Sequence, residues 1–220
     1  MRKSLLALSI LATALAAPLA QAYQAGDIIV RAGAITVDPH ESSSNVKIGG
    51  VAAPGTGATL DSDTQLGLTG TYMFTSHVGI ELLAATPFSH TVGTKGLGGL
   101  KLGTLKHLPP TLSVVYYPLD GTSAFQPYVG AGINYTWFFD TELSSEAETA
   151  GFRGLDMKDS WGFAAQVGMD YMLTDNLLLN ASMRYIDIET TGTTYAGPTK
   201  VSVDVDVDPF VYMVGLGYKF

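Results

Sequence analysis

Hydrophobic side chains alternate with small or polar ones along most of this chain. In residues 125–140 and 161–173 the odd-numbered positions carry most of the large apolar side chains, and in residues 65–74 the even-numbered positions do. A period of two residues is typical of β-strands, because successive side chains point to opposite faces of a sheet. Each segment therefore predicts a strand with one apolar, uncharged face and one face of small or polar residues.

The same pattern, interrupted by turn-forming segments, predicts eight strands. They cover residues 25–37, 61–74, 78–87, 109–118, 124–140, 158–173, 177–189 and 200–220. The connections alternate in length: 38–60, 88–108, 141–157 and 190–199 are long, whereas 75–77, 119–123 and 174–176 are short. We therefore expect an all-β fold, an eight-stranded antiparallel transmembrane β-barrel. Its short periplasmic turns lie at one end with both termini, and its long extracellular loops at the other.

The composition of the two strand faces favours this barrel over a soluble sandwich. In a sandwich the polar face meets water and usually carries many charges, whereas a narrow barrel lumen selects small residues. The polar faces here are rich in Gly and poor in Lys and Glu, and only 15% of all residues are charged. Aromatic residues lie near the ends of the apolar faces, as the two membrane interfaces require.

Two of the predicted strands contain a change of pattern. Val203, Val205 and Val207 alternate with acidic residues, but beyond Pro209 the apolar residues occupy the even positions, so we expect the membrane segment to be 210–220. The Val/Asp stretch then extends above the bilayer. Three acids along one strand diverge over about 13 Å, so a solvated face is expected rather than a Ca²⁺ site. In the seventh strand the charges also change face, between Arg184 and Asp187.

The N-terminus has the three parts of a secretory signal peptide. Arg2 and Lys3 precede an apolar run over residues 5–17, and Ala20-Gln21-Ala22 follows as an A-x-A cleavage site. We expect residues 1–22 to be removed and residues 23–220 to form the barrel. The protein is then exported through the periplasm to the outer membrane. The formal charge of −8 and the lack of cysteine argue against nucleic-acid partners, disulfides and thiolate metal sites.

Several longer motifs resemble a known family. LLAATPF (82–88), HLPPTL (107–112), PYVGAGINYT (127–136), KDSWG (158–162) and the terminal YKF (218–220) are similar to motifs of the OmpW family of Gram-negative outer-membrane proteins. The resemblance extends over essentially the whole mature chain. It implies an eight-stranded barrel in outer-membrane lipid, with a narrow and rather apolar channel and a role in uptake of small hydrophobic molecules. Tyr218 and Phe220 look like the C-terminal signal read by the barrel-assembly machinery.

The expected lumen contains charged and apolar residues. Glu81 belongs off the lipid face, because a charge near the bilayer midplane is unfavourable by a few kcal/mol. Leu83 shares its face and is expected to narrow the passage or contact a ligand. Arg31 is expected inside, where it can pair with Glu81, and Arg184 shares a face with Asn180 and Ser182. Arg184 departs from the family pattern and counts against a purely apolar channel. The candidate lumen residues are Leu83, Glu81, Arg31, Arg184, Asn134, Gln166 and Asp170.

Three classes of function fit a barrel too narrow for a general pore. The first is a channel or binding site for small hydrophobic solutes, and the leucines of the 93–105 connection are a possible first contact. The second is a structural or receptor barrel whose extracellular loops bind partners. The third is a lipid-modifying enzyme, for which His90 and His107 flank one connection. We expect no enzyme, because no catalytic motif accompanies these histidines, and neither a metal nor a cofactor is expected.

Overall fold

The computed structural model describes residues 22–220. The predicted signal peptide, apart from Ala22, lies outside the described residues. The described chain is built almost entirely of strands, and among its residues no helix has the length and hydrophobicity to cross a membrane.

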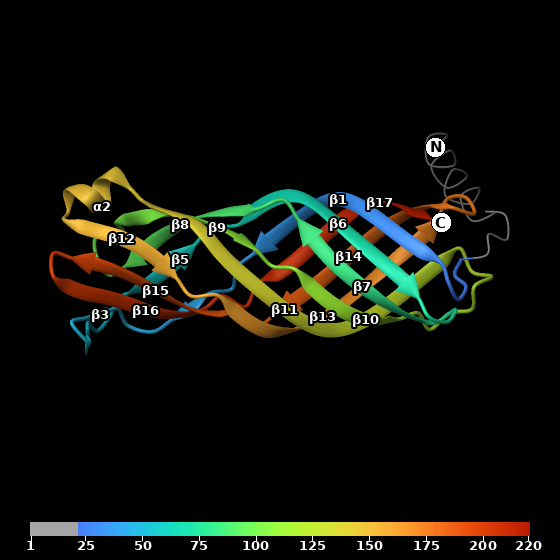
Figure 1. The fold of residues 1–220 in the computed structure, drawn as a ribbon, viewed down its shortest axis with the longest axis horizontal. Coiled ribbons are helices and arrows are strands. Elements are labelled where there is room, and N and C mark those ends of the chain that lie inside the picture. Colours follow the sequence, from blue (N-terminus) through green and yellow to red (C-terminus); the bar gives the residue numbers. More distant parts are fainter. Residues whose placement is uncertain (1–21) are drawn as a thin grey trace, which may run out of the picture.

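Eight antiparallel strands close into the expected barrel (Figure 1). They are β1 (Ile28–Asp38), β6 (Asp63–Met73), β7 (Val78–Ala85), β10 (Thr111–Tyr116), β11 (Phe125–Leu143), β13 (Ser160–Met172), β14 (Leu177–Ile186) and β17 (Phe210–Lys219). β1 pairs with β6 on one side and with β17 on the other, and β10 pairs with both β7 and β11. The prediction of an eight-stranded barrel is therefore confirmed.

The apolar strand faces point outward and the small or polar faces point inward. Trp161 and Phe163 on β13 are 72% and 75% exposed, whereas Gln166 and Asp170 on the same strand are buried. The ten residue steps from Trp161 to Tyr171 cover about 33 Å of strand, or about 25 Å along the membrane normal at a tilt near 40°. This matches the height of an apolar membrane band, so the exposed faces are the lipid-facing surface.

The long connections gather at one end of the barrel, as predicted, and much of their length forms further strands outside the ring. The β8 sheet consists of β5 (Gly57–Leu60), β8 (Phe88–Lys95) and β9 (Lys101–Leu108), and β9 pairs with the upper part of β11. The β16 sheet consists of β12 (Phe152–Met157), β15 (Glu189–Ala196), β16 (Thr199–Asp206), β3 (Lys47–Ile48) and β4 (Val51–Ala52), with β2 (Ser42–Ser43) on β16. A short helix, α2 (Ser145–Thr149), joins β11 to β12. Together they make an extracellular extension, at the left of Figure 1.

The two expected pattern changes divide single predicted strands into pairs. The predicted strand 177–189 is β14 followed by the start of β15, with a break at residues 187–188. The predicted strand 200–220 is β16 followed by β17, with a break at residues 207–209 where Asp208 has a positive φ of 39°. The two breaks lie side by side, because the amide of Val207 donates to the carbonyl of Ile188 at 2.8 Å. The barrel ends here and the extension begins.

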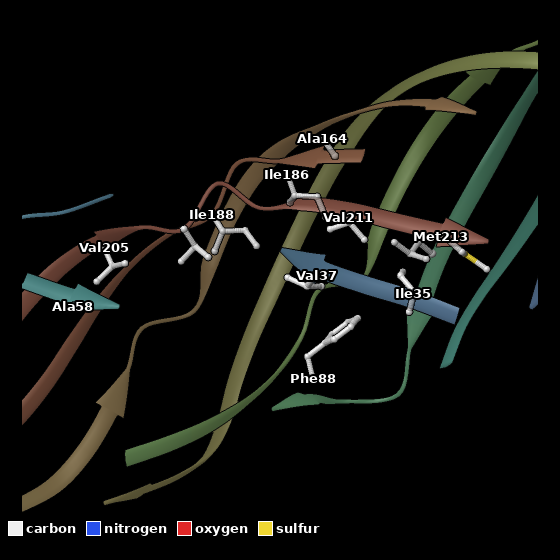
Figure 2. Packing of buried hydrophobic residues seen from close by; sticks show 12 residues of the cluster. Ile35, Val37, Ala58, Phe88, Ala164, Ile186, Ile188, Val205, Val211 and Met213 are labelled. Carbon is white, nitrogen blue, oxygen red and sulfur yellow. The ribbon is translucent and has the colours of Figure 1, made fainter. Parts of the chain in front are cut away.

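Two apolar clusters lie at different heights, and the upper one continues from the barrel interior into the extension. The lower cluster contains Ile29, Met73 and Met172, near the short turns. The upper cluster contains Ile35 and Ala164, which lie further toward the extension on β1 and β13 (Figure 2). Between these heights, the inward positions of β1, β7 and β13 carry charged residues.

Candidate functional site

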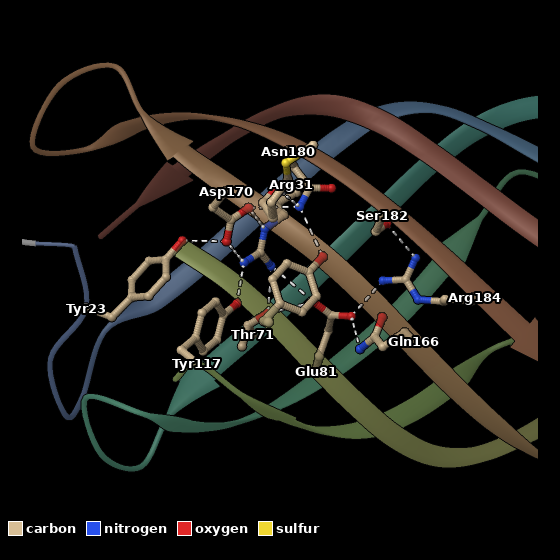
Figure 3. Close-up of polar contacts among 12 residues, drawn as sticks. Tyr23, Arg31, Thr71, Glu81, Tyr117, Gln166, Asp170, Asn180, Ser182 and Arg184 are labelled. Atoms are coloured by element: carbon tan, nitrogen blue, oxygen red, sulfur yellow. Dashed lines mark hydrogen bonds and ion pairs between the residues drawn. The ribbon is translucent and has the colours of Figure 1, made fainter. Parts of the chain in front are cut away.

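A buried ion network crosses the lumen between the two clusters (Figure 3). Arg31 of β1 donates from Nε and Nη2 to Asp170 of β13, at 3.0 and 2.6 Å. Its Nη1 lies 3.1 Å from Oε2 of Glu81 on β7. The expected pairing of Arg31 with Glu81 is thus present, and both side chains are almost fully buried. We call the residues of this network the polar layer.

Glu81 joins the second arginine to the network. Nη2 of Arg184 lies 2.7 Å from Oε1 of Glu81, and Nε2 of Gln166 donates to the same oxygen at 3.0 Å. Two arginines and two carboxylates make the polar layer neutral in formal charge. Balanced, hydrogen-bonded charge is the condition under which ions persist in a low-dielectric interior.

Tyrosine side chains complete the polar layer toward the short turns. Tyr23 donates its hydroxyl to Asp170 at 2.6 Å, and Tyr117 accepts from Nη2 of Arg31 at 2.7 Å. The guanidinium of Arg31 lies 5.5 Å from the ring centre of Tyr128, a cation–π distance. These tyrosines were not among the candidate lumen residues. The inward position of Tyr128, opposite the large apolar face of its strand, was the signal available.

Five of the seven candidate lumen residues belong to the polar layer: Arg31, Glu81, Gln166, Asp170 and Arg184. Asn134 lies elsewhere, nearer the extension. Its Nδ2 donates to the carbonyls of Pro109 and Pro110 at 3.1 Å and to the hydroxyl of Thr111 at 3.0 Å. Asn134 therefore fastens the entry of β10 to the barrel wall.

Leu83 lies in the upper cluster and not in the polar layer. It is 3% exposed and belongs with Ile35 and Phe88, whereas its neighbour Leu82 is 51% exposed on the lipid face. A constriction formed by Leu83 stays a prediction. The polar layer, one inward position further down β7, fills the lumen with desolvated charge.

A large apolar cavity lies between the β8 sheet and the β16 sheet. Its volume is about 430 Å³. Strands β5, β8 and β9 line one side, and β12, β15 and β16 line the other. The side chains that shape it include Leu60, Leu97, Leu100, Leu102, Leu155 and Val205. Three leucines of the 93–105 connection thus form a wall of this cavity.

The four histidines occupy three places. His77 lies in a short turn, 3.9 Å from Asp120, and the ring of His40 packs edge-on against Phe210. His90 and His107, by contrast, meet on neighbouring strands β8 and β9, with their Nε2 atoms 2.9 Å apart. Hydrogen bonds from the amides of Ser89 and Thr91 to the carboxylates of Asp63 and Asp61 fix this part of β8.

The acidic residues of β16 bind side chains of the extension. Asp204 accepts from Nζ of Lys47 at 2.8 Å and from the hydroxyl of Thr191 at 3.0 Å, and these hydrogen bonds lower its pKa. Ser42 donates to Asp206 at 3.4 Å. Among residues 22–220 no group of three or more His, Cys, Asp or Glu side chains is arranged to hold a metal ion.

Comparison with known proteins gives consistent similarities. A family model described as the OmpW family matches residues 24–220. The chain is 48% identical over 223 residues to Outer membrane protein W of Vibrio cholerae serotype O1, covering 100% of both chains. It is 30% identical over 200 residues to Outer membrane protein AlkL of Ectopseudomonas oleovorans, covering 90% of this chain and 84% of that one. The crystal structure of OprG from Pseudomonas aeruginosa matches with a TM-score of 0.88 at 54% identity, covering 91% of this chain and 98% of that chain.

Proposed function

Because this chain belongs to the OmpW family of outer-membrane barrels, we propose that it binds small hydrophobic molecules in its extracellular extension and passes them across the outer membrane. The observation that carries the proposal is the apolar cavity of about 430 Å³ between the two outer sheets. Cavities of this size, with a mostly apolar lining, suit small apolar ligands. A ligand that buries about 200 Å² of apolar surface there gains about 5 kcal/mol before ordering losses.

The polar layer supports a route that does not run along the barrel axis. An apolar solute moving down the lumen would have to separate Arg31 from Asp170 and Glu81, and breaking a buried ion pair is unfavourable by several kcal/mol. The paired strand breaks at residues 187–188 and 207–209 interrupt the two strands at the level where the barrel meets the extension. We infer that solute leaves the cavity sideways near these breaks and enters the lipid.

The experiment that tests binding fills the cavity. Ala58 lines it and is buried, so Ala58→Trp occupies part of the volume. Val51→Trp is the control, because Val51 is 72% exposed in the same extension. With protein in lipid nanodiscs, N-phenyl-1-naphthylamine should bind to the parent protein and to Val51→Trp, and much more weakly to Ala58→Trp. Equal binding by all three proteins would contradict the proposal.

A receptor function has one observation in its favour. Ile48 and Val51 form an exposed apolar tip on the β16 sheet. If the proposed transport fails its test, this tip is the surface on which to seek a partner. We assign no catalytic step to the protein, and we propose that Tyr218 and Phe220 are read by the barrel-assembly machinery.

A further inference from the structure

Two buried histidines adjoin the apolar cavity and have no part in the binding proposed above. His90 and His107 are 3% and 4% exposed, and their Nε2 atoms lie 2.9 Å apart. The ring of His107 stacks between Phe88 and Phe138, at centroid distances of 5.4 and 5.7 Å. Nδ1 of His90 lies 2.6 Å from the backbone carbonyl of Asp61. The pair is therefore a fixed chain of polar atoms, with aromatic rings on both faces of His107 and a carboxylate oxygen of Asp61 3.7 Å from Nδ1 of His90.

The direction of this chain follows from its fixed end. A carbonyl oxygen only accepts, so Nδ1 of His90 carries the proton. With Nδ1 as the donor nitrogen, Nε2 of His90 serves as the acceptor of this tautomer and accepts a hydrogen bond from Nε2 of His107. This leaves Nδ1 of His107 as a lone pair, and that atom is buried without a partner in the described chain. Burial and the neighbouring His90 lower the pKa of His107 to about 3, so the ring stays neutral near pH 7.

The unpartnered nitrogen belongs to a ring that lines a small cavity beside the large one. Its volume is about 20 Å³, room for about one water molecule or one hydroxyl group. Leu60 and Met157 line both cavities, so their side chains form the partition between them. The unbranched side chain of Met157 is the flexible part of that partition.

We propose that Nδ1 of His107 accepts a hydrogen bond from the single hydroxyl group of an otherwise apolar ligand, whose hydrocarbon body fills the large cavity. The inference rests on the proposed function and specifies its ligand class as aliphatic alcohols of medium length. A buried acceptor without a donor is unfavourable, and a hydroxyl group satisfies it while the apolar walls hold the chain.

The same geometry disfavours related molecules. An ether or a ketone of equal size has no proton to donate, so it leaves the nitrogen unpaired. A carboxylate places a negative charge against a lone pair in a cavity whose lining contains no Lys or Arg. The site therefore discriminates by hydrogen-bond donation and not by size.

The experiment compares 1-octanol with 1-methoxyheptane, which has the same heavy atoms but no donor. Each displaces N-phenyl-1-naphthylamine from protein in nanodiscs. The parent protein should prefer 1-octanol about tenfold, the effect of one buried hydrogen bond. His107→Phe keeps a ring between Phe88 and Phe138 and should lose the preference while still binding both compounds. His77→Phe, in a short turn at the other end of the barrel, should retain the preference for 1-octanol.

Each outcome has one meaning. Equal affinity for the two compounds in the parent protein, with both lost in Ala58→Trp, overturns the inference and leaves the proposed function standing. No displacement by either compound, with no effect of Ala58→Trp, overturns both. If His107→Phe fails to fold, the side-chain ¹⁵N resonance of Nδ1 in the parent protein decides. A shift with 1-octanol but not with the ether supports the hydrogen bond, and no difference shows that only water occupies the small cavity.

Discussion

Asp170 is the residue on which the polar layer depends most. It accepts from Arg31, from the hydroxyl of Tyr23 and from Nδ2 of Asn180, and it is fully buried. Replacing it removes one of the two negative charges of the polar layer and leaves Glu81 as the carboxylate that pairs with Arg31. Asp170→Asn should lower the free energy of unfolding by about 3–5 kcal/mol. Urea unfolding in lipid vesicles measures the loss. Asp175→Asn, in an exposed turn, is the control, and a similar loss in both variants would contradict this role.

Position 168 has no room for a side chain, because a tyrosine ring occupies the space beside Gly168. A Cβ at this position would overlap the ring and hydroxyl of Tyr128, whose oxygen accepts from Asn180 at 3.0 Å. Gly168→Ala should therefore displace Tyr128 and destabilise the barrel by about 1–3 kcal/mol. At Gly70 an added Cβ meets nothing within 4 Å. The midpoint of thermal unfolding should fall for Gly168→Ala and stay unchanged for Gly70→Ala.

At the scale of elements, the two faces of β7 make separate predictions. Leu82 faces lipid, so Leu82→Arg should impair folding by about 2–4 kcal/mol if it lies near the midplane. Leu83 faces the upper cluster, so Leu83→Ala should lose packing but still insert. Insertion into vesicles, followed by the change of gel mobility on boiling, measures both. Greater loss of insertion in Leu83→Ala than in Leu82→Arg would invert the assignment of the faces.

The β8–β9 pair should respond to pH through His107. Its pKa is lowered to about 3 in the folded protein, because burial and His90 disfavour the charged ring. The unfolded chain binds this proton near pH 6.5, so stability falls as pH decreases from about 6.5 toward 3. The slope is at most about 1.4 kcal/mol per pH unit. Unfolding midpoints between pH 7 and pH 4 should fall less steeply in His107→Phe than in the parent protein. Parallel slopes would contradict this assignment.

The spanning strands were predictable and the outer sheets were not, for a physical reason. A strand between lipid and lumen must keep one apolar face, so apolar and polar residues alternate in the sequence of the strand itself. The segments of the extension pack on one another. In residues 190–199, Thr and Gly suit turns as well as strands, and pairing with β12 and β16 decides their structure. The charged lumen residues were predictable because a charge on the lipid face is unfavourable. The tyrosines of the polar layer were not, because aromatic side chains also suit lipid.

At the scale of the whole molecule, side chains fill the barrel interior from the short turns up to the extension, where the apolar cavity begins. The lower cluster and the polar layer fill the lumen near the short turns, and the upper cluster separates them from the cavity of the extension. In this order the filled barrel interior lies between the short turns and the cavity of the extension. This order places the proposed ligand site beyond the membrane band, at the end where the sheets replace the ring.

The position of the bilayer on this molecule can be measured with its own tryptophans. The chain has two, Trp137 and Trp161, and both are exposed on the outer face near the upper end of the ring. Tryptophan at this position belongs to the aromatic belt of the membrane interface. In vesicles, quenchers placed shallow in the lipid should quench the fluorescence strongly and quenchers at the acyl-chain ends weakly. Stronger quenching by the quenchers at the acyl-chain ends would place both tryptophans nearer the bilayer midplane than described.

The pairing of β1 with β17 has a consequence for the folding of the newly synthesised chain. Ile29 lies opposite Lys219, and Nζ of Lys219 also donates to the carbonyl of Ala22 at 2.7 Å. The first strand to be synthesised therefore waits for the last before the ring can close. Until the ring closes, the apolar side chains of the lipid-facing surface are exposed to the water of the periplasm. Contacts this distant in sequence form slowly, so the exported chain should stay prone to aggregation until the ring closes.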